Sequence, residues 1–243
     1  MIELDLEVLL LSDATFGRGD GVAGLVDAEV EYEESTGLPF IRGRTLKGLL
    51  TEECANLLYA LALQNGGVVP ERVHAAARQL FGRPGSLRED DGLLRVGSAL
   101  LPHSLRAAVQ AEIDNGSITP ADALEALSSI RRQTAIDEQT GVPETNSLRA
   151  QRVVLRQTLF CARLSLLPGA KDEVVLLAVL SACVASLHRG GLGRNRGRGR
   201  LKATLYRKTP ERSTIDDAWE AVLFHERPNK TEPKHEPEAG VLT

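Results

Sequence analysis

A glycine-rich stretch late in the chain combines residue types that bind phosphate groups. From His188 to Arg200 glycines alternate with arginines, and no acidic residue occurs between Val174 and Thr209. Glycines expose backbone N–H groups, and arginines form charged hydrogen bonds with phosphates. The spacing matches no nucleotide-cofactor motif, so it predicts contact with a nucleic-acid backbone, the alternative being a solvated basic loop. The predicted contact residues are Gly190, Gly191, Gly193, Arg194, Asn195, Arg196 and Arg198.

A second basic stretch, residues 37–48, precedes a predicted helix. Thr45 is expected to cap this helix, and Lys47 lies in its first turn. A helix N-terminus offers free N–H groups and the positive end of the helix dipole, which together favour a phosphate. Ordinary capping with surface charge is the alternative. The predicted phosphate contacts are Arg42, Gly43, Arg44, Thr45 and Lys47.

Three aspartates near glycines could bind a divalent cation or orient a nucleophile: Asp13, Asp20 and Asp27. Their chemistry alone does not separate them, and a loop aspartate without a role is the commoner case. Five histidines are scattered without metal-ligand spacing, and only His188, beside the glycine stretch, is a candidate acid–base group. No serine or cysteine lies in a nucleophile motif.

Hydrophobic periodicity predicts the elements that must position these residues. Residues 2–11 alternate hydrophobic and acidic side chains, as in a strand with one buried face, and residues 174–187 form a strongly apolar helix. The remaining predicted elements are a glycine-rich loop at 16–24, a short strand at 26–32, helices beginning at 45 and spanning 70–81, 104–113 and 120–130, and strands at 93–100, 160–166 and 201–205.

Residues 131–157 predict a protruding β-hairpin, because two strand-like segments flank a loop that contains Gly, Pro, Asn and Ser. Without this insertion and the extra helices, the order is β-α-β-β-α-β. That order is typical of α+β proteins with an RRM-like, or ferredoxin-like, core. We therefore predict one domain over residues 1–208 and a C-terminal extension, 209–243, that is partly disordered and contains a short helix near 216–224.

Composition excludes several classes of protein. The chain has 243 residues, 42% of them hydrophobic, and its net charge of −4 requires any nucleic-acid contact to use a local basic patch. No apolar run is long enough for a membrane span, and three distant cysteines do not suggest a disulfide framework, so a cytoplasmic protein is expected. Aromatic residues make up only 4%, which argues against base stacking on the sheet.

Four landmarks in this sequence together resemble the RAMP superfamily. Residues 37–48, GLPFIRGRTLKG, resemble its PxIPGSSLKG signature. Leu80-Phe81-Gly82 followed by residues 95–99, RVGSA, resembles its LFG…hxhSDA stretch. Residues 132–141 resemble the entry to a "thumb" hairpin, and the loop at 190–199 resembles the glycine-rich loop before the last strand. The closest resemblance is to the Cas7 group, the Csm- and Cmr-like backbone subunits of type III CRISPR complexes.

This resemblance implies a subunit that polymerises along a CRISPR RNA and cleaves target RNA with Mg²⁺ or another divalent cation. Leu25-Val26-Asp27-Ala28 matches the position of the catalytic aspartate in active members, so Asp27 becomes the expected catalytic and metal-binding residue. The thumb would kink the guide–target duplex through Thr134, Ile136, Leu148 and Arg152, with Arg132 contacting RNA. The implied partners are CRISPR RNA, target RNA, neighbouring copies or paralogues, and other type III subunits, with no membrane.

The sequence also departs from the family pattern. Arg42 replaces the proline before Gly43, and Arg44 and Thr45 replace the serines; the extra charge suits contact with phosphate. The loop at 190–199 is richer in arginine than the family pattern, which suits a type III-D relative or another divergent branch. A non-catalytic structural subunit therefore remains an alternative. A guide-processing endoribonuclease that uses His188 is a further alternative, although such an enzyme needs no thumb, and a metabolic α/β enzyme lacks any supporting motif.

Overall fold

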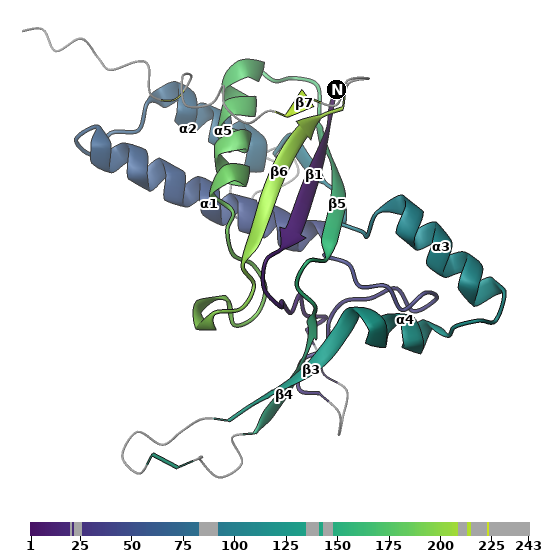
Figure 1. The fold of residues 1–243 in the computed structure, drawn as a ribbon. Coiled ribbons are helices and arrows are strands. Elements are labelled where there is room, and N and C mark those ends of the chain that lie inside the picture. Colours follow the sequence, from purple (N-terminus) through teal and green to yellow (C-terminus); the bar gives the residue numbers. More distant parts are fainter. Residues whose placement is uncertain are drawn as a thin grey trace, which may run out of the picture.

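The computed structural model describes residues 1–19, 21, 26–82, 92–134, 141–142, 148–208, 213–214 and 223. At its centre lies a five-stranded antiparallel sheet in the order β2-β5-β1-β6-β7 (Figure 1). The five strands are β1 (Ile2–Leu10), β2 (Leu94–Val96), β5 (Leu159–Leu166), β6 (Leu201–Arg207) and β7 (Ser213–Thr214). The protein is therefore a mixed α+β protein, as predicted.

The central strand β1 forms because its hydrophobic side chains recur at every second position. Leu4, Leu6, Val8 and Leu10 are fully buried, whereas the residues between them are half-buried on the opposite face. Leu6 lies opposite Ala162 of β5 and Leu205 of β6, which fixes the register on both sides. One face of the sheet is thus apolar and the other carries polar side chains.

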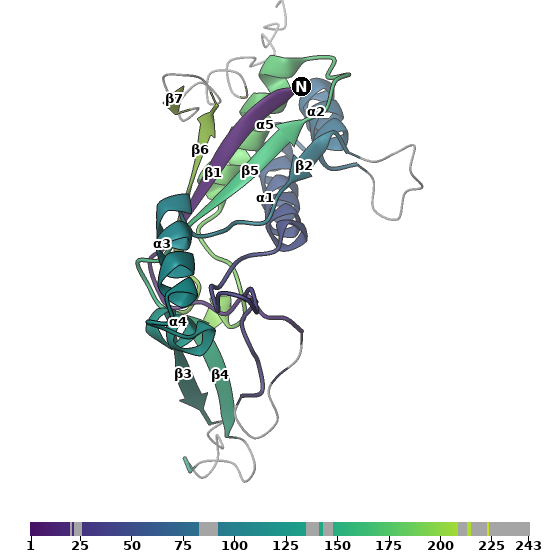
Figure 2. The same ribbon diagram turned by 90° about the vertical axis from the view of Figure 1, so that its right-hand side faces the viewer.

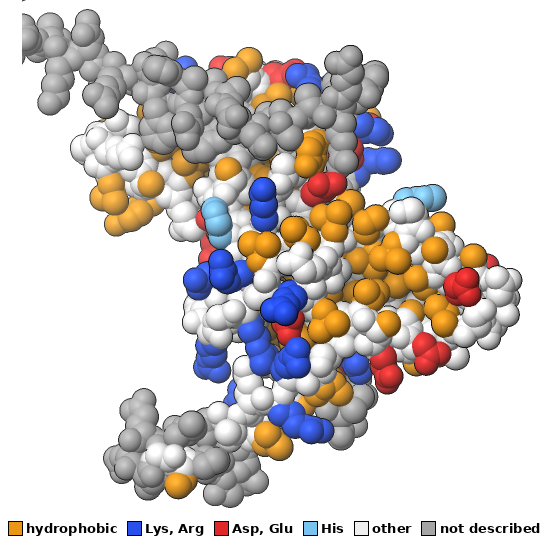
Figure 3. All heavy atoms as spheres, viewed as in Figure 1, with side chains coloured by type: hydrophobic (Ala, Val, Ile, Leu, Met, Phe, Trp, Pro, Cys, Tyr) orange, Lys and Arg blue, Asp and Glu red, His pale blue; other side chains and the backbone are white. Residues whose placement is uncertain are grey.

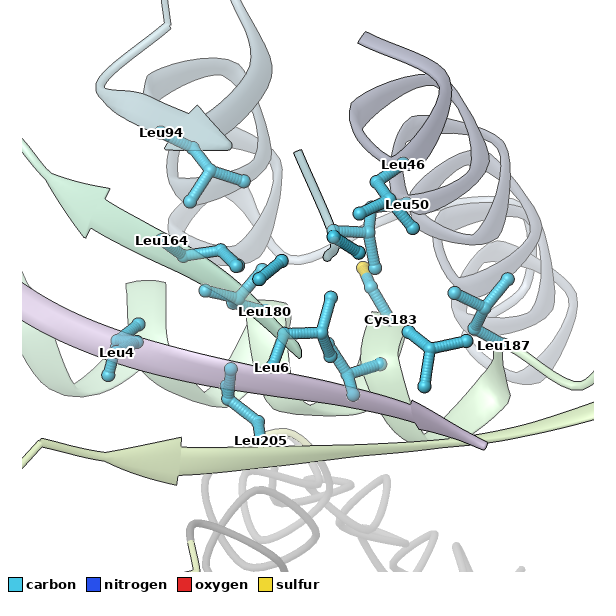
Figure 4. Packing of buried hydrophobic residues seen from close by; sticks show 14 of the residues in the cluster. Leu4, Leu6, Leu46, Leu50, Leu94, Leu164, Leu180, Cys183, Leu187 and Leu205 are labelled. Carbon is cyan, nitrogen blue, oxygen red and sulfur yellow. The ribbon is translucent and has the colours of Figure 1, made fainter. Parts of the chain in front are cut away.

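Three helices cover the apolar face of the sheet: α1 (Gly43–Gln64), α2 (Glu71–Phe81) and α5 (Glu173–Ser186) (Figure 2). Helix α5 is apolar on nearly all sides because it packs against α1, α2 and the sheet. Leu180 and Cys183 of α5 meet Leu6 of β1 and Leu50 of α1 in the core (Figure 4). No helix among the described residues is both long and apolar enough to cross a membrane.

The insertion between β2 and β5 extends away from this core (Figures 1 and 2). It contains α3 (His103–Asp114), α4 (Pro120–Leu127) and a separate antiparallel pair, β3 (Ser128–Gln133) and β4 (Arg149–Val154). We call this pair the β3–β4 ribbon. Its pairing runs from Ser128 opposite Val154 to Gln133 opposite Arg149. The remainder of the predicted hairpin includes Ile136 and lies partly outside the described residues.

Several predicted boundaries differ from the structure. Helix α4 ends at Leu127 instead of continuing to residue 130, because Ser128 is extended and its hydroxyl donates to the Leu124 carbonyl at 2.6 Å. Helix α1 begins at Gly43, so Thr45 is not its cap, and Arg42 caps it without a side-chain hydrogen bond. The segment predicted as a strand at 26–32 forms only isolated bridges, and the strand predicted over 93–100 is reduced to β2.

The C-terminal extension contributes two described features that the sequence did not predict. Strand β7 pairs with β6 at the sheet edge, and Leu223 is buried in the hydrophobic core. Apart from residues 213–214 and 223, the predicted extension over 209–243, with its helix and disordered tail, lies outside the described residues.

Candidate functional site

Asp27 lies in an extended segment beside the outer edge of β4. Its backbone N–H donates to the Ala150 carbonyl at 2.8 Å, and the Ala150 N–H donates to its Oδ2 at 2.6 Å. The side chain is exposed, and no other hydrogen bond among the described residues reaches its carboxylate. The strand edge therefore holds one oxygen of Asp27, Oδ2, although the side chain as a whole is exposed.

Gly21, in the loop predicted at 16–24, packs against this segment. A Cβ at this position would lie 2.3 Å from the Val26 carbonyl oxygen and 2.7 Å from the Asp27 carbonyl. Only glycine permits such a close backbone approach. Gly21 is thus a packing partner of Asp27 that the sequence did not single out among the loop glycines. Asp20, one of the rival aspartates, lies outside the described residues.

The structure differs from the expectation for Arg152. This residue is only 9% exposed at the base of the β3–β4 ribbon and forms an ion pair with the buried Glu29, its Nε lying 2.9 Å from Oε1. A wedge between bases must be exposed, so this placement argues against a wedge role for Arg152. Burial could not be predicted from sequence, because its partner lies 123 positions earlier in the chain.

The glycine-rich stretch forms an irregular loop that contains one short 3₁₀ turn, Arg194–Arg196. Gly193 and Gly197 flank the turn in the left-handed conformation, which explains glycine at both positions. Backbone hydrogen bonds tie the loop to the segment after β1: Leu192 N–H donates to Thr15 O at 2.8 Å, and Gly199 N–H to Asp13 O at 3.0 Å. The loop is therefore fixed at the end of the sheet next to the ribbon.

Two loop arginines reach neighbouring elements, and others remain exposed. Arg194 forms a bidentate ion pair with Glu52 of α1 at 2.8 Å for each bond; this pair lowers the pKa of Glu52 and raises that of Arg194. Arg198 Nη1 donates to Gln151 Oε1 of β4 at 3.2 Å. Arg196 and Asn195 are exposed, and among the described residues no hydrogen bond or ion pair is seen for either side chain. Arg198 thus places a cationic group beside Gln151 of β4. Gln151 directly follows Ala150, the residue that binds Asp27.

Arg132 adds a further charge at this junction. It is exposed on β3 directly opposite Ala150 of β4. Lysine and arginine side chains gather over the glycine-rich loop and the base of the ribbon (Figure 3). Asp27, β4, Arg132 and the loop are therefore brought together from sequence positions far apart, and we call them the junction site. Thr134 and Leu148 are exposed further along the ribbon.

The stretch at the start of α1 is engaged within the protein. Arg42 Nη2 donates to Glu31 Oε1 at 2.7 Å, Lys47 Nζ donates to the Leu94 carbonyl at 3.2 Å, and the Gly43 N–H donates to Ser98 Oγ at 3.3 Å. These three predicted phosphate ligands thus have internal partners. Arg44 and Thr45 are exposed. The glycine-rich loop contacts α1 further along the helix, at Glu52.

The other candidate groups are engaged differently. Asp13 Oδ2 accepts from the Arg131 guanidinium at 2.8 Å, and its Oδ1 from the Arg156 N–H at 3.1 Å. Partial burial acts to raise the pKa of Asp13, but these hydrogen bonds outweigh it, and the pKa lies below its ordinary value. His188 Nδ1 lies 2.7 Å from the Ser186 carbonyl. Among the described residues no cluster of three metal-ligating side chains occurs.

Comparison with known proteins identifies the family. The sequence profile of the RAMP superfamily matches residues 10–202, which cover most of the chain. The chain belongs to the RAMP superfamily. The match confirms the resemblance to this superfamily that the four sequence landmarks indicated. The matched residues include the glycine-rich loop at 190–199, the ribbon and Asp27. A search of curated proteins gave no match.

Solved structures share the RAMP fold of this chain. A chain of the type III-B Cmr-β complex bound to cognate target RNA aligns with a TM-score of 0.57 and 14% identity, over 84% of this chain and 97% of that chain. A chain of Cmr-β in the apo state aligns with a TM-score of 0.58 and 14% identity, over 89% of this chain and 98% of that one. At this identity the likeness establishes the fold alone.

Proposed function

We propose that this RAMP protein is an RNA-binding backbone subunit of a type III CRISPR ribonucleoprotein, similar to the Cas7 group. The Cmr-β chains that share its fold come from such a complex, one of them bound to target RNA. The strand order β2-β5-β1-β6 supports an RRM-like core, with α1 connecting β1 to β2 and α5 connecting β5 to β6. The β3–β4 ribbon, which extends from this core, would be the thumb, with Thr134 and Leu148 near its contact with the duplex.

The observation that carries the proposal is the junction site, where an arginine–glycine loop adjoins an exposed carboxylate. The exposed cations of Arg132, opposite Ala150 on the ribbon, and of Arg196 in the loop would contact phosphates of the RNA. The open face of the sheet does not offer an equivalent surface. Its central strand places Glu3, Asp5 and Glu7 on that face, and these carboxylates offset the nearby cations Lys208, which pairs with Glu3, and Arg163, which lies opposite Asp5. Guide RNA would therefore lie along the loop and the ribbon.

Target cleavage at Asp27 is the second part of the proposal. The 2′-hydroxyl of the target strand would attack the adjacent phosphorus while the bond to the 5′-oxygen breaks, leaving a cyclic phosphate and a 5′-hydroxyl. The other carboxylate oxygen of Asp27, Oδ1, would accept the proton of the attacking hydroxyl or orient it. The Ala150 N–H fixes the carboxylate through Oδ2 during this step. Neighbouring arginines would stabilise the charge that develops on the phosphate.

A divalent cation fits this site only if the RNA supplies further ligands. Asp27 is a single carboxylate, and the described residues contain no acidic cluster around it. Mg²⁺ binds proteins through one or two carboxylates together with substrate phosphates and water, so this donor set is compatible with it. A bound cation would polarise the phosphate. In that arrangement Asp27 Oδ1 would hold the cation in place of accepting a proton.

The test compares wild type, Asp27→Ala and Asp114→Asn in the assembled guide complex with labelled complementary RNA, in Mg²⁺ and in EDTA. Asp114 is an exposed carboxylate on α3, remote from the ribbon strands in sequence, and serves as the matched control. We expect Asp27→Ala to lower the cleavage rate by about 100-fold or more with target binding retained, and Asp114→Asn to behave as wild type. EDTA should abolish cleavage by wild type.

A non-catalytic RNA-gripping subunit is the second candidate, and the bond between Asp27 and Ala150 favours it. This bond gives the carboxylate a structural role at a strand edge without any chemistry. Unchanged cleavage by Asp27→Ala would support this scaffold role and contradict the nuclease proposal. If a His188→Ala variant instead lost processing of the guide precursor, the chain would be a guide-processing enzyme.

A further inference from the structure

The segment that carries Asp27 is attached to β4 as an additional short strand. Ala28 pairs with Gln151 in a parallel bridge, and the Arg152 N–H donates to the Ala28 carbonyl at 3.0 Å. Together with the two hydrogen bonds between Asp27 and Ala150, these contacts determine which residue of β4 faces the carboxylate. A shift by one residue would turn Asp27 to the other side of the segment, because strand side chains alternate.

Backbone contacts at an exposed strand edge specify the register only weakly. A buried ion pair between Glu29, two residues after Asp27, and Arg152 of β4 adds a contact that depends on the register. Glu29 is 3% exposed, and Arg152 Nε lies 2.9 Å from its Oε1 and 3.1 Å from its Oε2. Arg152 also donates from Nη1 to Ser128 Oγ at 3.2 Å, and the Thr15 hydroxyl donates to its carbonyl at 2.8 Å. The Arg152 side chain thus joins β4 to the Asp27 segment and to the start of β3, and its backbone carbonyl joins β4 to the segment after β1.

The geometry of this pair suits a positioning role better than a purely stabilising one. Burying two charges is costly, and a buried pair contributes little net stability compared with apolar residues of similar size. Its specific effect is to disfavour every other register, because any shift leaves both charges buried without a partner. Glu29 follows Asp27 by two positions, so both side chains lie on the same side of an extended segment, toward β4.

We propose that Glu29 and Arg152 are positioning residues that lock the Asp27 segment in register on β4. The carboxylate is thereby held at a fixed place relative to the β3–β4 ribbon. This inference depends on the proposed function for its catalytic consequence. If the ribbon engages the guide–target duplex, the lock places Asp27 at one backbone position relative to that contact.

The first measurement uses the full chain and needs no activity. The Ala150 N–H donates to Asp27, so its hydrogen exchange, followed by NMR, reports the register directly. Asp27→Ala gives the exchange rate without the carboxylate. The variant is Glu29→Gln with Arg152→Met, which leaves no buried charge and should keep the chain folded. We expect its Ala150 N–H to exchange about tenfold faster than in wild type, approaching the rate in Asp27→Ala.

The second measurement uses the assembled guide complex and target RNA. The double variant should lower the cleavage rate by about 100-fold while target affinity stays at the wild-type value, because a small displacement of a reacting group is enough for such a loss. Arg152→Lys with Glu29 intact restores the charge and should recover part of the rate. Arg131→Met is the matched control, since it removes the other ion pair on the ribbon, with Asp13, without touching the Asp27 segment.

The outcomes separate the inference from the proposed function. Wild-type Ala150 exchange in the double variant, or equal losses in Arg131→Met, would overturn the positioning role. If the wild-type complex does not cleave RNA but the double variant still releases the Ala150 N–H, the register lock stands and the nuclease proposal fails.

Discussion

Gly43 shows how one position can satisfy a sequence motif for a different physical reason. Its place before a basic helical turn suggested contact with a phosphate. In the structure a Cβ on this residue would lie 2.2 Å from the Val96 carbonyl oxygen, and its N–H donates to Ser98 Oγ. Glycine is therefore required because the start of α1 lies directly against the end of β2. A role in binding RNA is not needed to explain it.

We expect Gly43→Ala to destabilise the fold by about 1–3 kcal/mol, because the added methyl group collides with backbone that cannot move independently. Gly48→Ala on the same helix is the control. No atom lies within 4 Å of a Cβ there, so alanine should stabilise α1 by about 0.4–1 kcal/mol. Denaturant unfolding of both variants measures the difference. Equal stability of the two would contradict the close packing at Gly43.

Arg152 marks the limit of what individual residues reveal in a sequence. An arginine in a polar hairpin is ordinarily exposed, and nothing local distinguishes one that is buried. Its environment is created by Glu29, which reaches it only because the loop after β1 returns to β4. By contrast, Asp27 is an exposed carboxylate, and the catalytic role that the resemblance implied for it stays a prediction. The family pattern, and not local chemistry, separated it from Asp13.

The β3–β4 ribbon is fastened to the segment after β1 by Asp13, which binds β3 and the residues that follow β4. Arg131 of β3 donates two hydrogen bonds to Asp13 Oδ2, and the N–H of Arg156, just after β4, donates to Oδ1. The sequence predicted the two strands from their flanking turn residues, but it placed the end of α4 too late. The first residues of β3 pair with residues of β4 that lie 22 to 26 positions later, and that pairing overrides the local helical pattern over 128–130.

The Asp13 fastening should weaken in acid. The hydrogen bonds from Arg131 and Arg156 favour the charged form and hold the pKa of Asp13 below 3.8, despite the opposing effect of partial burial. A depressed pKa in the folded state stabilises the protein above the unfolded pKa, and this contribution disappears as the pH falls through the folded value. We therefore expect the stability difference between wild type and Asp13→Asn to be largest near neutral pH and to shrink below 3.8. Unfolding free energies measured against pH check this, and a difference independent of pH would contradict it.

The distribution of charge over the protein decides which surface can bind RNA. The net charge is −4, but the positive charge is concentrated on the glycine-rich loop and the ribbon, whereas β1 carries a row of carboxylates on the open sheet face. The sequence predicted the loop patch because arginines recur at short intervals between glycines there. It could not show that Arg42 and Lys47 have partners within the protein, because Glu31 and the Leu94 carbonyl reach them only after folding.

Binding of guide RNA to the full chain should therefore depend on salt in a way that identifies this surface. Each phosphate contact with a single strand contributes about 0.7 to the slope of log affinity against log salt. Arg196→Ala removes an exposed loop cation, so we expect weaker binding and a slope that is shallower by about that amount. Arg163→Ala removes the same charge from the open sheet face, opposite Asp5 of β1, and should leave the slope unchanged. Fluorescence anisotropy over a range of salt concentrations distinguishes the two variants. A shallower slope for Arg163→Ala, together with an unchanged slope for Arg196→Ala, would place the RNA on the sheet. Bases would then have to stack against a central strand, β1, that has no aromatic side chain.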